Sequence, residues 1–380
     1  MLDGVGIGAA PDAAAYGDEG SHTLGHVLEA CRPDLPNLAR LGLGNIAPLP
    51  GLAPVSDPGA AYGRMQEVSA GKDSTTGHWE LAGIRLETPF PTYPDGFPEP
   101  VIKQFLDVTG STRVLGNRPE SGTAIITEFG AEHLATGNPI VYTSADSVFQ
   151  VAAHVDRVPL ETLYDWCRLA REQVCTGEHA VGRVIARPFT GEPGAFVRLS
   201  GKRHDYALAP TAEPLQSTLQ VAGIRTVCVG KVADLFAGVG FDEVRKTSGN
   251  AEGIRETLVA MQAATAQSTF IWTNLIDFDQ EFGHRNNPEG FAGALEQFDR
   301  ALPDLLAALP DGGRLLITAD HGNDPTTAST DHAREYVPLL YVGVPPVDLG
   351  IRHGFTDHAA TVADYFGVPY PVDGQSFEPA

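Results

Sequence analysis

The chain has 380 residues, with 48 acidic and 26 basic side chains and a formal net charge of −22. This length exceeds the usual size of one hydrophobic core, so it predicts one large domain and a second, smaller one. The negative charge argues against a nucleic-acid partner or an anionic membrane held by bulk charge, and an anionic substrate would need locally concentrated positive charge from metal ions or clustered arginines.

Cysteine usage and hydropathy indicate the compartment. The four cysteines are scattered without a CxxC pair, and no basic apolar leader opens the chain. No apolar run approaches the roughly 20 residues that a membrane helix needs. We therefore expect a cytoplasmic monomer with no membrane partner.

Two features occupy the N-terminal part of the chain. Asp3 has the position of a residue at the end of a buried strand, yet only two residues precede it, so we expect the leading residues of that strand to be missing. Residues 71–80 hold a glycine-flanked hydroxyl cluster, which predicts a turn entering a helix. A hydroxyl there becomes a nucleophile when metal ions and a helix N-terminus stabilise its alkoxide, and the same groups would hold a phosphoryl oxyanion.

The middle of the chain is bounded by two breaker-rich stretches, residues 87–98 and 208–214. We place domain boundaries at both, which gives a core of residues 1–87 and 211–380 and an inserted domain of residues 88–210. The insert has strand-like segments and one helical pattern, which together predict a smaller α+β cap: strands at 124–127, 139–142, 181–186 and 195–199, and a helix at 161–174.

Short apolar runs alternate with helical patterns in the C-terminal part. This alternation predicts an α/β core with a mostly parallel sheet flanked by helices. In such sheets ligands gather beyond the carboxyl ends of the strands, where Asp279 and Asp320 fall. The expected strands are 224–229, 269–276, 314–318 and 338–342, and the expected helices are 251–266, 288–309 and 356–366.

Acids and histidines recur at these strand ends. Asp320 and His321 follow the apolar run 315–319, His284 comes five residues after Asp279, and His332 comes eleven residues after His321. An Asp-His pair by itself is more often a cap or a surface arrangement. With Asp3, however, the set holds three acids and three histidines, enough ligands for two metal ions.

Five motifs together resemble a known family. They are residues 3–12, 71–80, 277–285, 320–324 and 329–338. The likeness is to the phosphopentomutases of the alkaline phosphatase superfamily, and it runs nearly end to end. It implies an isomerase of nucleoside catabolism that interconverts ribose 1-phosphate and ribose 5-phosphate, and their 2-deoxy forms. It also implies two manganese ions, a phosphorylated hydroxyl and a pentose or hexose bisphosphate as activator.

The resemblance also implies roles for single residues. One manganese would be held by Asp3, Asp320 and His321, with the Ser74 hydroxyl approaching it. The second would be held by Asp279, His284 and His332. Sugar hydroxyls would contact Ser144 and Asp146, phosphate would contact Arg183 and Arg198, and Lys231 would be a further substrate contact.

The nucleophile position departs from the family pattern. The family usually carries threonine there, whereas this chain has Ser74 followed by Thr75 and Thr76. Serine serves in related phosphatases and mutases, so we expect Ser74 to be phosphorylated, and the neighbouring threonines remain alternatives. Arg183 and Arg198 have a plainer alternative as well, which is pairing with the abundant carboxylates.

Other functions fit parts of the pattern. A phosphate or phosphonate monoesterase on the same core would use water in the second half-reaction, and a cofactor-independent phosphoglycerate mutase would share the metal site but recognise a carboxylate. A sulfatase would need a Cys/Ser-x-Pro-x-Arg signature, which the sequence lacks. A non-catalytic acidic metal-binding protein would explain the charge but not Ser74 in its glycine-flanked turn.

Overall fold

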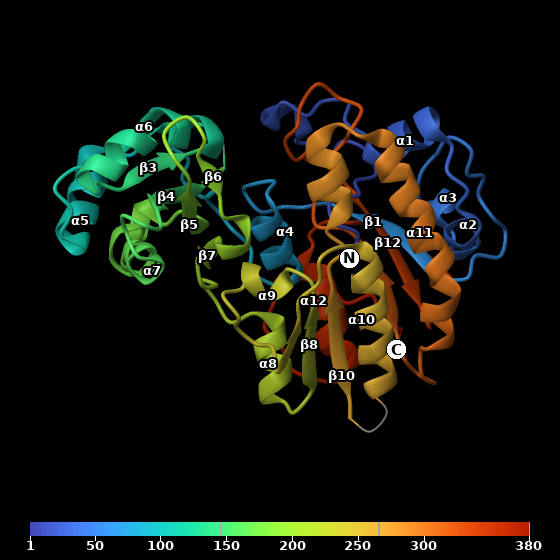
Figure 1. The fold of residues 1–380 in the computed structure, drawn as a ribbon. Coiled ribbons are helices and arrows are strands. Elements are labelled where there is room, and N and C mark those ends of the chain that lie inside the picture. Colours follow the sequence, from blue (N-terminus) through green and yellow to red (C-terminus); the bar gives the residue numbers. More distant parts are fainter. Residues whose placement is uncertain (145, 265–266, 380) are drawn as a thin grey trace. The chain divides into compact units, whose positions relative to one another are not determined.

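The computed structural model describes residues 1–144, 146–264 and 267–379. The chain forms two compact units (Figure 1). We call Met1–Thr88 with Pro210–Ala380 the core unit and Pro89–Ala209 the inserted unit. The domain boundaries expected from the sequence lie within one residue of this division. The roles expected of the two domains stay predictions.

The core unit combines helices with two sheets. Its helices are α1 (Thr23–Cys31), α2 (Pro36–Leu41), α3 (Leu43–Ile46), α4 (Ser74–Leu81), α8 (Leu215–Val221), α9 (Val232–Leu235), α10 (Asn250–Ala263), α11 (Pro288–Ala307) and α12 (Thr356–Tyr365). Its strands are β1 (Ala61–Met65), β8 (Arg225–Val229), β9 (Glu243–Arg245), β10 (Thr269–Thr273), β11 (Leu315–Ile317), β12 (Val337–Val342) and β13 (Asp348–Arg352).

The two sheets of the core have the orders β11-β12-β1-β13 and β10-β8-β9. In the second sheet β8 is parallel to both of its neighbours. In the first, β12 is antiparallel to β1 and β11, while β1 and β13 are parallel. Parallel pairing therefore accounts for three of the five pairings in the described core. The α/β class predicted from the alternation of strands and helices is confirmed.

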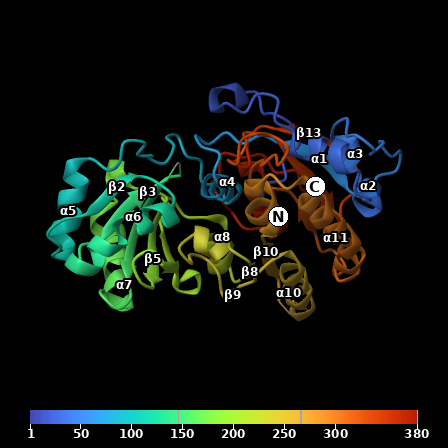
Figure 2. The ribbon, with the colours of Figure 1, turned by 45° about the horizontal axis from the view of Figure 1, so that its top comes forward.

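Helices cover both faces of the β8–β10 sheet (Figures 1 and 2). Ile271 of β10 packs with Ala260 of α10 on one face. Phe270, one residue earlier and so on the opposite face, packs with Ala359 and Ala363 of α12. Because apolar side chains are needed on both faces of this sheet, these strands are continuous apolar runs in the sequence.

Helix α11 shows why the C-terminal helical patterns were readable. Asn287 caps its start by accepting the N–H of Gly290 at 2.9 Å, and Pro288 occupies the first turn, where no backbone donor is needed. Apolar side chains then recur every three or four residues and are buried on one stripe: Phe291, Leu295, Phe298, Leu302 and Leu305.

The inserted unit is built on one mixed sheet with the order β2-β3-β4-β5-β6, and β7 pairs with β5. Helices α5 and α7 pack on one face and α6 on the other. Its strands are β2 (Leu115–Pro119), β3 (Ile140–Thr143), β4 (Val148–His154), β5 (Arg183–Thr190), β6 (Val197–Arg198) and β7 (His204–Ala207). Its helices are α5 (Glu99–Thr109), α6 (Gly122–Thr136) and α7 (Leu160–Leu169).

One element of the insert was predicted wrongly. Residues 124–127, expected as a strand, lie in α6. Ser121 caps this helix by accepting the N–H of Ala124 at 3.2 Å, and Ile125 and Ile126 are buried against the sheet. A short apolar run fits a buried helix turn as well as a strand, so its periodicity cannot decide between the two.

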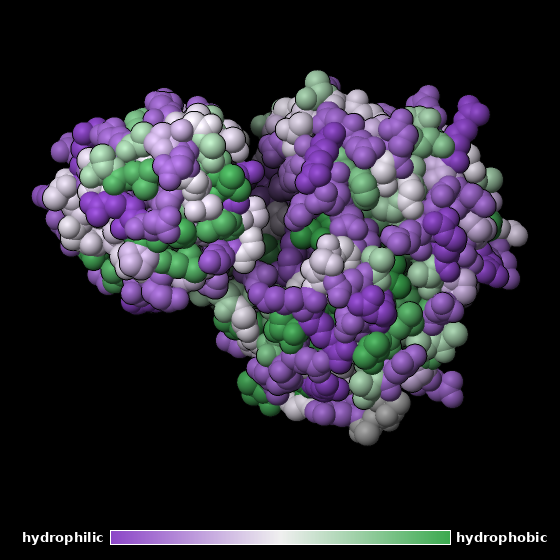
Figure 3. All heavy atoms as spheres, viewed as in Figure 1, coloured by the Kyte–Doolittle hydropathy of each residue, from purple (hydrophilic) through white to green (hydrophobic). Residues whose placement is uncertain are grey.

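Hydrophilic side chains cover most of the face of each unit that is drawn in Figure 3. Among the described helices, none combines the length and apolar character that crossing a membrane requires.

Candidate metal centre

The candidate ligands of the core unit meet at one edge of its sheets. Asp320 and His321 come directly after β11, and Asp279 lies in a short helical turn, Phe278–Phe282, beyond the end of β10. The N-terminal residues reach the same place, because the Leu2 N–H donates to the Thr318 carbonyl at 2.8 Å. Asp3 therefore follows a backbone segment that lies at the carboxyl ends of both strands.

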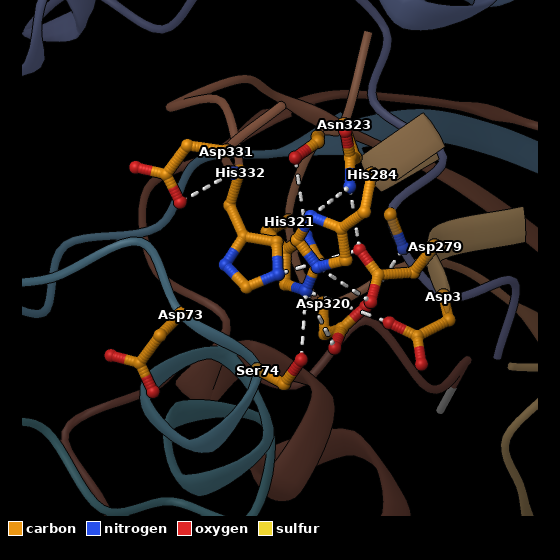
Figure 4. A network of polar contacts seen from close by, with 12 residues as sticks. Asp3, Asp73, Ser74, Asp279, His284, Asp320, His321, Asn323, Asp331 and His332 are labelled. Carbon is orange, nitrogen blue, oxygen red and sulfur yellow. Dashed lines mark hydrogen bonds and ion pairs between the residues drawn. The ribbon is translucent and has the colours of Figure 1, made fainter. Parts of the chain in front are cut away.

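Two groups of ligand atoms form there (Figure 4). The atoms of Asp3, Asp320 and His321 lie within 4.8 Å of one another, and so do those of Asp279, His321 and His332. His284 joins the second group, with Nε2 3.4 Å from Asp279 Oδ2. The six side chains expected as ligands are thus brought together, and His321 lies between the two groups.

Burial and neighbouring charge set the protonation of this cluster. Burial, reinforced by the charge of Asp320, raises the pKa of Asp3 well above its usual value. Burial would also raise the pKa of Asp320, but its interactions with the imidazoles of His321 and His78 outweigh burial and hold that pKa low. Burial lowers the pKa of His321 to about 4, so its imidazole is neutral at neutral pH, the form that binds metals.

The donor set fits divalent cations. The Oδ1 atom of Asp3 is buried and accepts no hydrogen bond from the residues that the structure describes. A buried carboxylate oxygen without a donor is costly unless a cation compensates it. Carboxylate oxygens and imidazole nitrogens are ligands that suit Mn²⁺ as well as Zn²⁺, so the residues match metal ions without selecting one.

Ser74 is the first residue of α4 and faces the first group of ligands. Its Oγ lies 3.1 Å from His321 Nε2 and accepts a hydrogen bond from Lys231 Nζ, also at 3.1 Å. Asp73 caps the helix, and its Oδ2 accepts the hydroxyl hydrogen of Thr76 at 2.5 Å. The Ser74 hydroxyl points toward the candidate ligands (Figure 4), whereas the Thr76 hydroxyl donates to the capping residue Asp73.

Lys231 is the cation of this site. Its Nζ lies 2.5 Å from Asp3 Oδ2, and its side chain is 19% exposed. Burial alone would lower its pKa, but the carboxylates of Asp3 and Asp279 raise it above the usual lysine value. An ammonium group therefore stands beside the Ser74 hydroxyl at neutral pH.

Two side chains of the site were not assigned from the sequence. His78 Nδ1 lies 2.8 Å from the Ser74 carbonyl oxygen and 3.0 Å from Asp320 Oδ2. Asn323 Nδ2 donates to Asp279 Oδ1 at 2.7 Å. The i, i+4 spacing from Ser74 to His78 on one helix face was the available signal for the first, and the Asp-His-Gly-Asn tetrad was the signal for the second.

Arg334 fixes the loop that leads to Ser74. It is 2% exposed, and its guanidinium donates to the carbonyl oxygens of Ser69 at 2.9 Å and Gly71 at 2.6 Å. A further hydrogen bond, at 2.9 Å, reaches Asp12. Because these bonds are charge-assisted and buried, they hold the residues before α4 to the segment that leads into β12.

The expected sugar and phosphate contacts lie in the inserted unit. Arg183, on β5, is 3.6 Å from Asp205 and 3.9 Å from Asp146, so it pairs with carboxylates as the plainer alternative expected. Arg198 lies on β6, which pairs with β5. The Oγ of Ser144 accepts the N–H of Asp146 at 3.4 Å. Their contact with a substrate stays a prediction.

Comparison with known proteins adds relatives along the whole chain. The model of the metalloenzyme superfamily matches residues 1–370. The chain is 52% identical to a phosphopentomutase of Caldanaerobacter subterraneus, over 99% of this chain and 95% of the relative. It is 53% identical to phosphopentomutases of Acetivibrio thermocellus and Deinococcus radiodurans, in each case over 99% of this chain and 97% of the relative.

A solved structure agrees with the fold. A phosphoglycerate mutase of Leishmania mexicana is 13% identical, with a TM-score of 0.51 over 99% of this chain and 96% of the other. At that identity the likeness concerns the fold, and the activity rests on the sequence relatives. The chain belongs to the metalloenzyme superfamily and, within it, to the phosphopentomutases, which are isomerases.

Proposed function

We propose that this enzyme interconverts ribose 1-phosphate and ribose 5-phosphate, and their 2-deoxy forms, through a phosphorylated Ser74 and two manganese ions. The relatives support a phosphopentomutase. The observation that carries the choice of nucleophile is the Ser74 hydroxyl between His321 and Lys231, at 3.1 Å from each.

Two ligand sets would hold the metal ions. Asp3, Asp320 and His321 are proposed for one, and Asp279, His284 and His332 for the other. When bound, the ions would supply positive charge that stabilises the developing negative charge on the transferring phosphoryl group. Asn323 and His78 would orient the carboxylates of Asp279 and Asp320 through the contacts described above.

The transfer is proposed to begin with phosphoserine. The bond between phosphorus and Ser74 Oγ breaks, a new bond forms to a hydroxyl oxygen of the pentose monophosphate, and the proton of that hydroxyl ends on Ser74. A pentose bisphosphate results. The bond between its other phosphorus atom and the sugar oxygen then breaks, that phosphoryl group bonds to Ser74 Oγ, and the serine proton ends on the sugar oxygen, which completes the isomerisation. Lys231 would stabilise negative charge on Ser74 Oγ in both steps, and a sugar bisphosphate would phosphorylate an enzyme that has lost its phosphate.

The inserted unit is proposed to recognise the sugar phosphate. A guanidinium matches a phosphate group with two parallel hydrogen bonds, which suits Arg183 and Arg198 for the phosphate that is not reacting. Ser144 and Asp146 would contact sugar hydroxyls. In this role Arg183 would exchange its carboxylate neighbours Asp146 and Asp205 for the substrate.

One assay tests the proposal. The protein with Mn²⁺ is given ribose 1-phosphate and a catalytic amount of sugar bisphosphate, and both ribose 5-phosphate and free phosphate are followed. Ribose 5-phosphate without matching phosphate release is the expected result, and Ser74→Ala should abolish it together with the phosphoprotein. Thr76→Val, which keeps the shape of the neighbouring side chain, should retain phosphorylation at Ser74. Release of phosphate as the main product would make the enzyme a monoesterase.

A further inference from the structure

Three arginines of the inserted unit lie on the α6 side of its sheet. Phe189 of β5 packs against α6 on that side. Side chains alternate between the two faces of a sheet, so Arg183 and Arg187, which precede Phe189 on the same strand by even numbers of residues, share this face. Arg198 of β6 lies opposite Phe189 and shares the face as well. Along β5, Arg187 therefore lies between two residues already proposed to contact phosphate.

The Arg187 guanidinium forms no ion pair with the residues that the structure describes. Its Nε donates to Gln150 Oε1 at 2.9 Å, which orients the group and leaves its two Nη atoms available to a ligand. Burial and the charge of Arg203 lower the pKa of Arg187, whereas Asp205 is engaged by Arg203, with two N–O distances of 2.6 Å. A partly buried guanidinium without a carboxylate partner, in a chain of net charge −22, is a candidate contact for an anionic ligand.

The Tyr142 hydroxyl lies in the same cluster and lacks a partner. The residue is 1% exposed, and its Oη makes no hydrogen bond with the described part of the chain. Burial raises the pKa of this hydroxyl, and the positive charges of Arg187, Arg198 and Arg203 oppose that rise, so all three guanidiniums act on it. A buried hydroxyl without an acceptor is destabilising unless a ligand supplies one.

The N-terminus of α6 brings backbone donors to this hydroxyl. Ser121 caps the 15-residue helix, and the N–H groups of Gly122 and Thr123 come before the first intrahelical hydrogen bonds. A Cβ atom on Gly122 would lie 2.7 Å from Tyr142 Oη and 3.5 Å from Arg198 Nη1, so the glycine leaves the helix start open to both groups. An anion at this point would meet the positive end of the helix dipole, a hydroxyl donor and a guanidinium together.

We propose that Arg187, Arg198 and the Tyr142 hydroxyl bind a phosphate group at the start of α6, with Arg187 as a further substrate contact. The inference rests on the proposed function, because this phosphate would be the one that is not reacting at Ser74. A phosphate dianion balances two guanidinium charges and has acceptor oxygens for both groups and for the hydroxyl. Arg198 is exposed on β6, so its guanidinium can close on the ligand. Such clustered arginines are the positive charge that an anionic substrate of so acidic a protein requires.

Titration of inorganic phosphate into the whole chain in EDTA tests the site. The amide NMR signals of Gly122 and Thr123 are followed, and saturable shifts are expected in the wild-type protein. Arg187→Gln, which removes the charge and keeps much of the side chain, should raise the midpoint at least about tenfold. Tyr142→Phe, which removes a single oxygen atom, should raise it about threefold to tenfold.

Arg157→Gln is the matched control. The exposed Arg157 donates to the Thr136 carbonyl at 3.1 Å, at the opposite end of α6, so its loss should leave the midpoint unchanged. Tyr142→Phe preserves the packing of the ring and remains a folded test protein whatever Arg187→Gln does to stability. An unchanged midpoint in either site variant would overturn the proposal, and so would amide shifts that stay linear in phosphate concentration.

The mutase assay with Mn²⁺ then separates this site from the proposed function. Arg187→Gln should raise the KM for ribose 5-phosphate at least about tenfold, while the KM for a small aryl phosphate, which carries no phosphate beyond the reacting one, should stay within about twofold. No isomerisation by the wild-type protein would refute the proposed function, and the phosphate titration would still decide the site. Saturable phosphate binding with an unchanged KM for ribose 5-phosphate in Arg187→Gln would overturn the role of the site in holding the substrate.

Discussion

Replacing Lys231 by methionine should destabilise the metal-free protein much more than the manganese-loaded protein. The Lys231 ammonium lies 2.5 Å from Asp3 Oδ2, and the Asp3 and Asp320 side chains are fully buried. Without metal, this ammonium is the cation that partners Asp3. Methionine preserves most of the side-chain volume, so the change removes charge with little loss of packing.

The magnitude follows from the burial of the pair. Removing one partner of a buried ion pair costs about 3–5 kcal/mol, and the lower end applies because the Lys231 side chain is 19% exposed. Manganese bound by Asp3 and Asp320 would replace the missing charge, so we expect a loss of about 1 kcal/mol in the loaded protein. By linkage, the difference of about 2 kcal/mol appears as roughly 30-fold tighter manganese binding to the variant.

Urea unfolding in EDTA and in saturating Mn²⁺ measures both losses, and calorimetric titration measures the affinity. Lys246→Met is the matched control, since that side chain is 79% exposed and 3.8 Å from Asp234, and it should change stability by less than about 0.5 kcal/mol. Equal losses with and without manganese, or weaker manganese binding to the Lys231 variant, would refute the reasoning.

Three further substitutions probe the site and its surroundings. Asp320→Asn should weaken manganese binding at least about 100-fold by calorimetry, because a neutral amide removes a ligand charge; the exposed Asp331→Asn is its control, and equal affinities would exclude Asp320 as a ligand. Arg183→Ala should lower mutase kcat/KM by a factor that corresponds to a loss of about 3 kcal/mol in transition-state binding, while kcat/KM for hydrolysis of a small aryl phosphate should fall much less. Equal losses on both substrates would place Arg183 in the general architecture. Burial lowers the pKa of His358 to about 4. As the pH falls from about 6.5 to about 4, His358 therefore takes up a proton in the unfolded protein but not yet in the folded protein, and the free energy of unfolding decreases across that window. His358→Gln should flatten the unfolding free-energy curve there by up to about 3 kcal/mol, and parallel curves would contradict this.

The prediction of secondary structure from the sequence was most accurate where a hydrophobic periodicity extended over several turns. Helix α11 has a cap, a proline in the first turn and an apolar stripe of several turns, and it was predicted to within a few residues of its observed end. The segment 124–127 failed because four apolar or small residues carry no period, and the decision lay with Ser121 and the sheet against which α6 packs. Long-range packing decided that element, and no local pattern records it.

The meeting of Asp279 and Asp320 was predictable because residues that follow the strands of an α/β core gather at the carboxyl edge of its sheets. The ends of the predicted strands and the alternation of strands and helices were enough to place Asp279 and Asp320 at this edge. His78 could not be assigned in the same way, because its contact with Asp320 depends on α4 lying against the segment after β11. A residue 242 positions away supplies its partner, and the sequence gives no distance between them.

The two buried acids of the candidate metal centre differ in protonation because their neighbours differ. Asp3 and Asp320 are both fully buried, and burial by itself favours a higher pKa for each, but only the pKa of Asp3 is raised and that of Asp320 is held low. Two buried carboxylates side by side cannot both ionise cheaply. Asp320 has His78 at 3.0 Å and His321 at 3.3 Å and keeps its charge, whereas Asp3 has Lys231 and carries the raised pKa. A metal ion held by both acids would supply further positive charge beside Asp3, and Lys231 Nζ, which also donates to Ser74 Oγ at 3.1 Å, would supply positive charge at that oxygen.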